Sequence, residues 1–360
     1  MLKPIATAAV TAAMLTVVVP AQAKDLIIAA SLPKAHFWVG GHMELFADEI
    51  EAATNIRFQR FDAGALTGVG REMDALTGGS IDVAAPLLAP YHEGRFPLSD
   101  VTQLPTYGTN AVMVTKAFLK LMDSDFKLKG DDNFLSYEIT SKGLLAWPVG
   151  TTGAYVISTT GKELRSPDDL RGLPLRAGSA LHTIVLEQLG ATPVTMPSSQ
   201  AYEAMSRGTV DGLVSSIGDW KSYSFQELLK YTISGVSLGN WGSYLATTNE
   251  VWNKLSEQDR KTWDGIARKA ALSNAAAIDK QDTDVRVAAE AAGSKFVDIS
   301  ELPDAMQEHV AKAGANTWIR WIEQTEAKGH PAKATAKLWV ELIQEQGGRV
   351  PQGVSEYLEK

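Results

Sequence analysis

The chain has 360 residues, with 34 Lys plus Arg, 42 Asp plus Glu and a formal net charge of −8 at pH 7. This acidic balance argues against nucleic acid or an anionic membrane surface as the main partner, because both require a concentrated basic face. There is no cysteine, which excludes thiolate catalysis, cysteine-ligated metal sites and disulfides. A chain of this length can bury a sizeable core and usually divides into two domains or lobes.

The first 23 residues have the pattern of a secretory signal peptide. Lys3 carries the only charge, residues 5–19 are apolar, and Ala21-Gln22-Ala23 is a small-residue cleavage site. The apolar run is shorter than the roughly 20 residues that span a bilayer, and Pro20 interrupts its end. We therefore expect export to the periplasm, with cleavage before Lys24.

Strand and helix patterns alternate after this segment. An apolar run of strand type at Asp25–Ser31 precedes a helix whose apolar residues recur at three-and-four spacing, and strand, helix and strand follow. This alternation predicts an α/β lobe. The elements expected after the first strand are Met43–Ile50, Ile56–Phe61, Glu72–Leu76 and Ile81–Ala84.

A related unit recurs further on, as strand Thr192–Met196, helix Gln200–Ser206 and strand Thr209–Val214. The segments MDALTGGSIDVA, from Met73, and EAMSRGTVDGLV, from Glu203, have helix residues, glycine, a hydroxyl residue, a β-branched residue and aspartate in the same order. If this match is not a coincidence, each lobe carries its own copy of one α/β cassette.

A long helix is expected near the end of the chain. Ser256, with Asp259 three residues later, suits a helix N-terminus, and little interrupts helical sequence up to Ala292. At about 1.5 Å per residue this helix would be on the order of 55 Å long, more than one lobe is wide, so it should lie across both lobes. Further helices are expected at Leu302–Ala313, Thr317–Lys328 and Lys333–Gln344, followed by a polar tail.

The segment SPDDLRGLPLRAGS, Ser166–Ser179, is the most informative in the chain. Leu173 and Leu175 alternate inward as a short strand, so Arg176 faces the other way at its carboxyl end, directly before the expected helix Ala180–Leu189. An arginine beside a helix N-terminus offers a planar fork of donors that suits a carboxylate. α/β folds bind ligands at such strand-to-helix turns. A surface arginine paired with an acidic neighbour is the alternative.

Six segments, spread in order along the mature chain, carry a family resemblance. They are FADEIEAAT at Phe46, GGSIDVA at Gly78, RFPLSDVTQLP at Arg95, SPDDLRGLPLRAGS at Ser166, LEQLGATPVTMPSSQAYEAMSRGTVDG at Leu186 and NEVWNKLSEQDRKTW at Asn249. In this order they resemble the solute-binding proteins of TRAP (tripartite ATP-independent periplasmic) transporters, of the dicarboxylate-binding type.

The resemblance implies a periplasmic-binding-protein-like α/β fold, with two lobes around a ligand cleft and a long helix that spans both. It also implies closure over a small organic acid and delivery of that acid to the membrane subunits of a TRAP permease, without a cofactor. The match GLPLR places the family's carboxylate-binding arginine at Arg176. We divide the chain into signal peptide 1–23, lobe I 24–146 plus 238–272, lobe II 147–237 plus 273–330, and C-terminal helix and tail 331–360.

Three positions depart from the family pattern. The usual asparagine after the VDG motif is Ser215, no second arginine stands near Gly150-Thr151-Thr152, and a common phenylalanine is missing from Met196-Pro197-Ser198-Ser199. These changes remove polar contacts that a dicarboxylate or sugar acid would use. We therefore expect a mainly apolar or aromatic monocarboxylate held by Arg176, with Ser215 and Thr152 as further contacts.

Aromatic residues stand at loops that should face the cleft. They are Phe37, Trp38, Trp147, Trp220 and Trp241, and His36 and Asn240 could donate hydrogen bonds beside them. Each tryptophan could instead be a core residue, because large aromatics supply much of any core's buried area. His36 could likewise be a structurally satisfied histidine.

Two other classes of function remain open. Gly235-Val236-Ser237-Leu238-Gly239 matches the nucleophile elbow of serine hydrolases, but the residues that follow are poor helix material and the elbow requires a helix. The same scaffold could instead present its ligand to a sensor kinase. The six histidines have no metal-site spacing, so we expect no metal.

Overall fold

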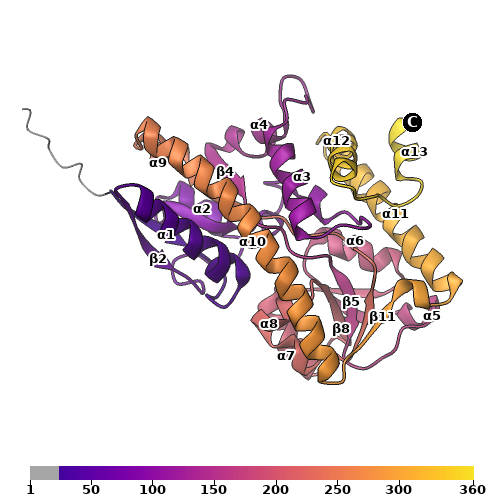
Figure 1. The fold of residues 1–360 in the computed structure, drawn as a ribbon. Helices are drawn as coiled ribbons and strands as arrows, with labels where there is room; N and C mark the ends of the chain where they lie inside the picture. The colour runs from indigo at the N-terminus through magenta and orange to yellow at the C-terminus, as the bar shows by residue number, and fades with distance from the viewer. Residues whose placement is uncertain (1–23) are drawn as a thin grey trace, which may run out of the picture.

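The first lobe is built on a mixed five-stranded sheet. The computed structural model describes residues 24–360, so the expected signal peptide lies outside the described residues. The strand order is β2-β1-β3-β10-β4, in which β1, β2 and β3 are parallel and β10 is antiparallel to both of its neighbours. The strands are β1 (Lys24–Ala29), β2 (Ile56–Phe61), β3 (Val83–Leu87), β4 (Leu144–Pro148) and β10 (Tyr244–Thr248). Helices α1 (Glu44–Ala53) and α2 (Glu72–Thr77) connect the three parallel strands (Figure 1).

The second lobe is built on a six-stranded sheet of order β11-β9-β5-β8-β6-β7. Strands β6, β7 and β8 are parallel, and β5 is antiparallel to β8 and β9. The strands are β5 (Val156–Thr159), β6 (Pro174–Ala177), β7 (Thr192–Thr195), β8 (Gly212–Ser215), β9 (Tyr231–Ser234) and β11 (Lys295–Asp298). The helices among them are α5 (Pro167–Leu170), α6 (Ala180–Gln188), α7 (Ser198–Ser206) and α8 (Asp219–Tyr223).

The two sheets share one topology. The order β2-β1-β3-β10-β4 corresponds to β7-β6-β8-β5-β9, and every pair of neighbours has the same relative direction in both sheets. Helix α2 leads into β3 as α7 leads into β8, so the two similar segments found in the sequence occupy equivalent places. The expected repeated cassette is confirmed.

Two extended segments carry the chain between the lobes, residues 149–155 after β4 and residues 235–243 after β9. The crossings are hydrogen-bonded to each other, by Thr152 N to Trp241 O at 3.1 Å and by Tyr155 N to Gly239 O at 2.9 Å. Gly239 has a φ of +100°, and a Cβ there would lie 2.0 Å from Gln103 O, so only glycine fits.

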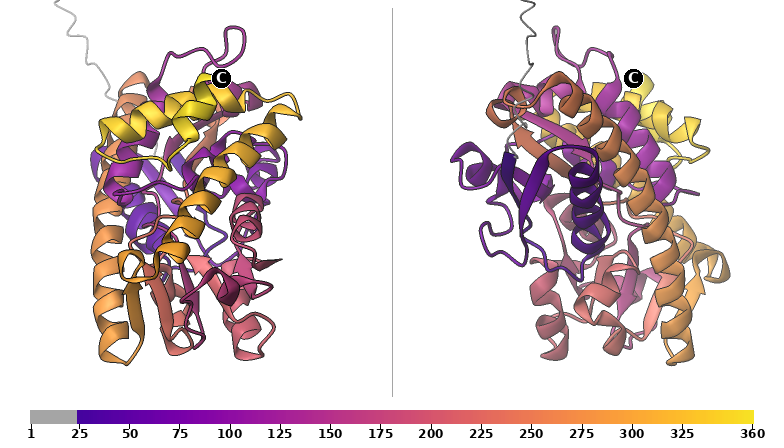
Figure 2. Two further views of the ribbon diagram at one scale, coloured as in Figure 1. Left: turned by 90° about the vertical axis from the view of Figure 1, so that its right-hand side faces the viewer. Right: turned by 60° about the vertical axis from the view of Figure 1, so that its left-hand side comes forward.

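A single 35-residue helix, α10 (Glu257–Ala291), runs along both lobes, as the long uninterrupted sequence predicts (Figure 2). Ser256 caps it by accepting a hydrogen bond from Asp259 N. On the first lobe α10 packs against α1 and α3 (Ala111–Asp123). On the second lobe, Gly218 N donates to Asp282 Oδ1 at 2.7 Å and Gln281 Nε2 donates to Gly218 O at 2.8 Å.

The C-terminal part differs from the expectation. Residues 304–326 form one helix, α11 (Asp304–Glu326), where two helices were predicted. Gly314 does not end the helix: it lies buried within α11, where a Cβ would be at ordinary contact distance from Pro351 and Pro105. The expected polar tail contains a short helix. The remaining helices are α4 (Phe134–Glu138), α9 (Asn249–Asn253), α12 (Ala332–Glu345) and α13 (Val354–Glu359).

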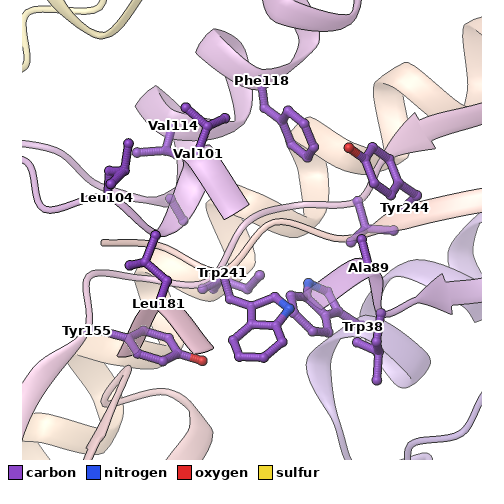
Figure 3. Close-up of a cluster of buried hydrophobic side chains, with 14 of the residues drawn as sticks. Trp38, Ala89, Val101, Leu104, Val114, Phe118, Tyr155, Leu181, Trp241 and Tyr244 are labelled. Atoms are coloured by element: carbon purple, nitrogen blue, oxygen red, sulfur yellow. The ribbon is translucent and has the colours of Figure 1, made fainter. Parts of the chain in front are cut away.

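The buried core continues from one lobe to the other. Figure 3 shows Trp38 and Ala89 of the first lobe close to Trp241 of a crossing segment, with Tyr155 and Leu181 on the other side of Trp241. The lobes therefore meet through side chains near the crossings. Over residues 24–360, every helix is too short or too polar to cross a membrane.

Candidate ligand-binding site

A small cavity of about 70 Å³ lies between the lobes, close to the crossings. Its walls come from the loops that follow β1, β2 and β3 in the first lobe, from the segments that follow β7 and β8 in the second, and from the two crossings. The carboxyl ends of strands are where open α/β sheets bind ligands. The lining residues are Ser31, Leu32, Pro33, His36, Trp38, Val69, Leu88, Tyr91, Thr152, Tyr155, Pro197, Ser198, Ser199, Asp219, Tyr223 and Trp241.

Arg176 stands beside this cavity at the end of β6 and is only 1% exposed. Its Nε donates to Met196 O at 2.9 Å and its Nη2 donates to Ser198 Oγ at 3.0 Å. Gly178 makes room for it, because a Cβ there would lie 3.0 Å from Nη2. Within residues 24–360 no carboxylate forms an ion pair with this guanidinium, so its charge is buried among neutral acceptors.

Three tyrosines surround the guanidinium. The Tyr91 hydroxyl lies close to Arg176 across the lobe boundary, and the Tyr223 hydroxyl lies close to Ser198. Burial raises the pKa of Tyr91, Tyr155 and Tyr223, although the Arg176 charge acts in the opposite direction on each. All three therefore carry neutral hydroxyl groups that can donate hydrogen bonds.

A second charged side chain, Asp219, lines the cavity and is 4% exposed. Its Oδ1 lies 3.5 Å from His36 Nε2, and its Oδ2 accepts from Ser216 Oγ at 3.1 Å. His36 Nδ1 accepts from Trp38 N at 3.2 Å, so the ring proton must be on Nε2 and the imidazole is neutral. Among residues 24–360, Asp219 thus forms no ion pair with a Lys or Arg side chain.

The remaining walls are aromatic. The Trp241 ring lies 5.1 Å from Tyr91 and 5.8 Å from His182, and Tyr155 stacks on His182 at 4.6 Å, all between ring centroids. Desolvation and, secondarily, Arg176 lower the pKa of His182 to about 3, so this imidazole is neutral. Trp241 Nε1 is buried and has no hydrogen-bond partner among the described residues.

The structure brings together most of the residues singled out in the sequence. His36, Trp38, Thr152 and Trp241 line the cavity, and Arg176 contacts the lining residue Ser198. Asn240 lies one step back, because its Nδ2 donates to Thr152 O at 2.8 Å and so holds a cavity wall.

Three other expected residues lie away from the cavity. Trp147 donates to Asp264 on α10 and packs against Trp252, since its place on β4 points it into the first lobe's core. Ser215 donates only to Ser216 O, at the buried end of β8. Trp220 is fully buried against Phe296.

Sequence reasoning missed the lining residues Tyr91, Tyr155, Tyr223 and Asp219. One signal could have found two of them: Tyr91 and Asp219 both follow the last parallel strand of their cassette, β3 or β8. Short loops and a five-residue helix have no periodicity by which the other side chains could be placed.

The hydrolase-like pentapeptide has another explanation. Ser237 lies in the second crossing and its Oγ is 3.3 Å from Thr106 Oγ1, while the chain continues into β10 rather than into a helix. Its last glycine, Gly239, is required by the close approach to Gln103. In the described part of the chain, no group of three or more His, Asp or Glu could hold a metal.

Two lobes of equivalent topology, two crossing segments and a cavity at facing strand ends define a two-lobed solute-binding protein. The family model of the bacterial extracellular solute-binding proteins, family 7 (DctP), matches residues 28–319, and the chain belongs to this family. This confirms the fold class and the family expected from the sequence segments.

Individual relatives agree with this assignment. A solute-binding protein of Albidiferax ferrireducens is 24% identical over 262 residues, 71% of this chain and 74% of its own length. A TRAP solute-binding protein from Rhodoferax ferrireducens T118, solved with copurified benzoate, is 22% identical with a TM-score of 0.77, covering 90% of this chain and 98% of that one. A marine metagenome TRAP solute-binding protein specific for aromatic acid ligands, solved with 3-hydroxybenzoate, is 23% identical with a TM-score of 0.76, covering 91% and 99%.

Proposed function

We propose that this protein captures a small carboxylic acid with an apolar or aromatic body in the periplasm and delivers it to a TRAP permease. The signal peptide, cleaved before Lys24, directs export. Arg176 holds the ligand carboxylate, and the rings of Trp38, Tyr91 and Trp241 enclose the rest of the molecule.

The observation that carries this proposal is the buried charge of Arg176 without a carboxylate partner. A buried cation is strongly unfavourable unless an anion compensates it. The guanidinium also faces neutral tyrosine hydroxyls, which can donate further hydrogen bonds to an anion. A ligand carboxylate supplies the missing charge and accepts these donors.

The character of the walls supports the apolar body. Apart from Arg176 and Asp219, the groups around the cavity are neutral, and most of the larger ones are aromatic. Apolar walls with a few converging polar groups are typical of small-molecule sites. The relatives solved with benzoate and 3-hydroxybenzoate have the same fold, and their ligands are aromatic monocarboxylates.

A thermal-shift screen of residues 24–360 against four groups of acids tests the proposal. The groups are aromatic monocarboxylates, aliphatic monocarboxylates, dicarboxylates and sugar acids. A ligand at about 100 times its Kd should stabilise the fold by roughly 2.7 kcal/mol. We expect stabilisation by monocarboxylates. Hits confined to dicarboxylates would contradict the ligand class, and no hit in any group would contradict the function.

A further inference from the structure

Two buried groups of opposite charge share the ligand cavity without pairing with each other. Arg176 contacts Met196 and Ser198, whereas Asp219 contacts Ser216 and His36. Both belong to the second lobe, Arg176 at the end of β6 and Asp219 in the segment that follows β8. A single carboxylate on the ligand would compensate the charge of Arg176 but would form no favourable interaction with Asp219.

Asp219 retains capacity to accept hydrogen bonds. An ionised carboxylate offers about four lone-pair sites, and among residues 24–360 this one accepts a side-chain hydrogen bond from Ser216 Oγ at 3.1 Å and has His36 Nε2 nearby at 3.5 Å. Because the carboxylate also lines the cavity, its remaining acceptor sites are available to a bound molecule.

We propose that Asp219 determines specificity by accepting a hydrogen bond from the ligand, which is therefore a carboxylic acid that also bears a hydroxyl or ammonium group. This inference rests on the proposed function, since it names the substrate class of the same site. A second carboxylate on the ligand would be repelled by Asp219, so simple dicarboxylates are excluded by the same group. A hydroxyl and an ammonium group can both donate a hydrogen bond to Asp219, and the experiment below distinguishes between them.

Matched sets of acids provide the test, measured by isothermal titration calorimetry. The sets are phenylacetate, mandelate and phenylglycine, then benzoate, 3-hydroxybenzoate and 3-aminobenzoate, then propanoate, lactate and alanine. Within each set the acids have the same skeleton and differ in the donor. We expect at least one donor-bearing acid to bind at least about tenfold more tightly than its parent, because hydrogen bonds to charged groups are the stronger kind. The acid that gains the most affinity over its parent identifies the donor as a hydroxyl or an amine.

Variants of Asp219 show whether this residue causes the tighter binding of the donor-bearing acids. Asp219→Ala should bring the affinities of the donor-bearing acid and its parent close to each other, and Asp219→Asn should give an intermediate ratio. Glu138→Gln is the matched control, because Glu138 is a fully buried carboxylate outside the cavity, bonded to Leu98 N and Ser99. It should leave the ratio unchanged. If the alanine variant does not fold, as judged by its melting curve, the affinity ratios of the asparagine variant and of the wild-type protein still test the role of Asp219.

The outcomes separate this inference from the function on which it rests. Parent acids that bind as tightly as all of their donor-bearing derivatives would overturn the role of Asp219 and leave the binding function intact. An unchanged ratio in both Asp219 variants would show a merely structural role and also overturn it. If no acid of any set binds the wild-type protein, both the function and the inference fail.

Discussion

The two lobes are built from the same cassette but bring different chemistry to the cavity. In the first lobe, the loops after β1 and β3 contribute neutral groups, among them Trp38, Leu88 and Tyr91. In the second lobe, the equivalent strands β6 and β8 lead to the two charged side chains, Arg176 and Asp219. One scaffold therefore allows recognition to be divided: charge comes from the second lobe, whereas ring surface comes from the first lobe, the crossings and Tyr223 of α8.

The largest expected effect follows from removing the second lobe's cation. Arg176→Gln should lower the affinity for the acid found in the screen by at least about a hundredfold, because the bound carboxylate would stay buried without its charged partner. Calorimetric titration measures this. Arg171→Gln is the control, since that side chain is 80% exposed and bonded to the nearby Asp168, and it should bind normally. Equal affinities in the two variants would contradict the proposed site.

The next effect concerns the helix that joins the lobes. Burial, followed by the charges of Asp219 and Asp279, raises the pKa of Asp282 from 3.8 to about 8. Between about pH 4 and pH 8 the folded chain therefore holds a proton on Asp282 that the unfolded chain has released. The contribution of this group to the free energy of unfolding is greatest below about pH 4 and is lost as the pH rises towards 8. The loss is up to about 1.4 kcal/mol per pH unit in this window.

Asp282→Asn should flatten that dependence while keeping an acceptor for Gly218 N. Melting temperatures of wild type and variant at pH 5 and pH 8 measure it, and we expect a smaller difference between the two pH values in the variant. Burial also raises the pKa of Glu138 in the first lobe to about 7, so the melting temperature of the variant should still depend on pH to some extent. An unchanged difference would show that Asp282 ionises normally in the fold.

A smaller effect is expected from Tyr91, which approaches the cation from the first lobe. Tyr91→Phe removes the hydroxyl that faces Arg176 and keeps the ring against Trp241. Affinity for the acid should fall several-fold, corresponding to about 1 kcal/mol. Tyr137→Phe is the matched control, because that hydroxyl is bonded to His330 and lies outside the cavity. A loss as large as that of Arg176→Gln would contradict the division between the lobes.

The last substitution should leave ligand binding unchanged and affect only the stability of the fold. Ser256→Ala removes the N-cap of α10 and should lower the free energy of unfolding by about 1 kcal/mol. Urea unfolding measures the loss, and calorimetric titration should give the wild-type affinity. A weaker affinity would show that the start of α10 influences the cavity from a distance.

Much of the scaffold could be predicted from the sequence because its signals are periodic. The long helix, the repeated cassette and the place of Arg176 before α6 follow from apolar spacing and a strand-to-helix turn. Trp147 could not be placed, because a tryptophan near a strand end can point into the core or into the cleft. Residues 302–328 were predicted as two helices, but Gly314 lies buried inside the single helix α11, and only the tertiary structure reveals that burial.

The uncompensated Arg176 also affects the protein before it meets a ligand. Bringing Tyr91 and Trp241 over a bare guanidinium removes water from a cation and returns no anion, so we expect an empty molecule to favour separated lobes. Occupancy and shape are then coupled through a single charge. A membrane partner that distinguishes the two shapes could tell a loaded carrier from an empty one without touching the cargo.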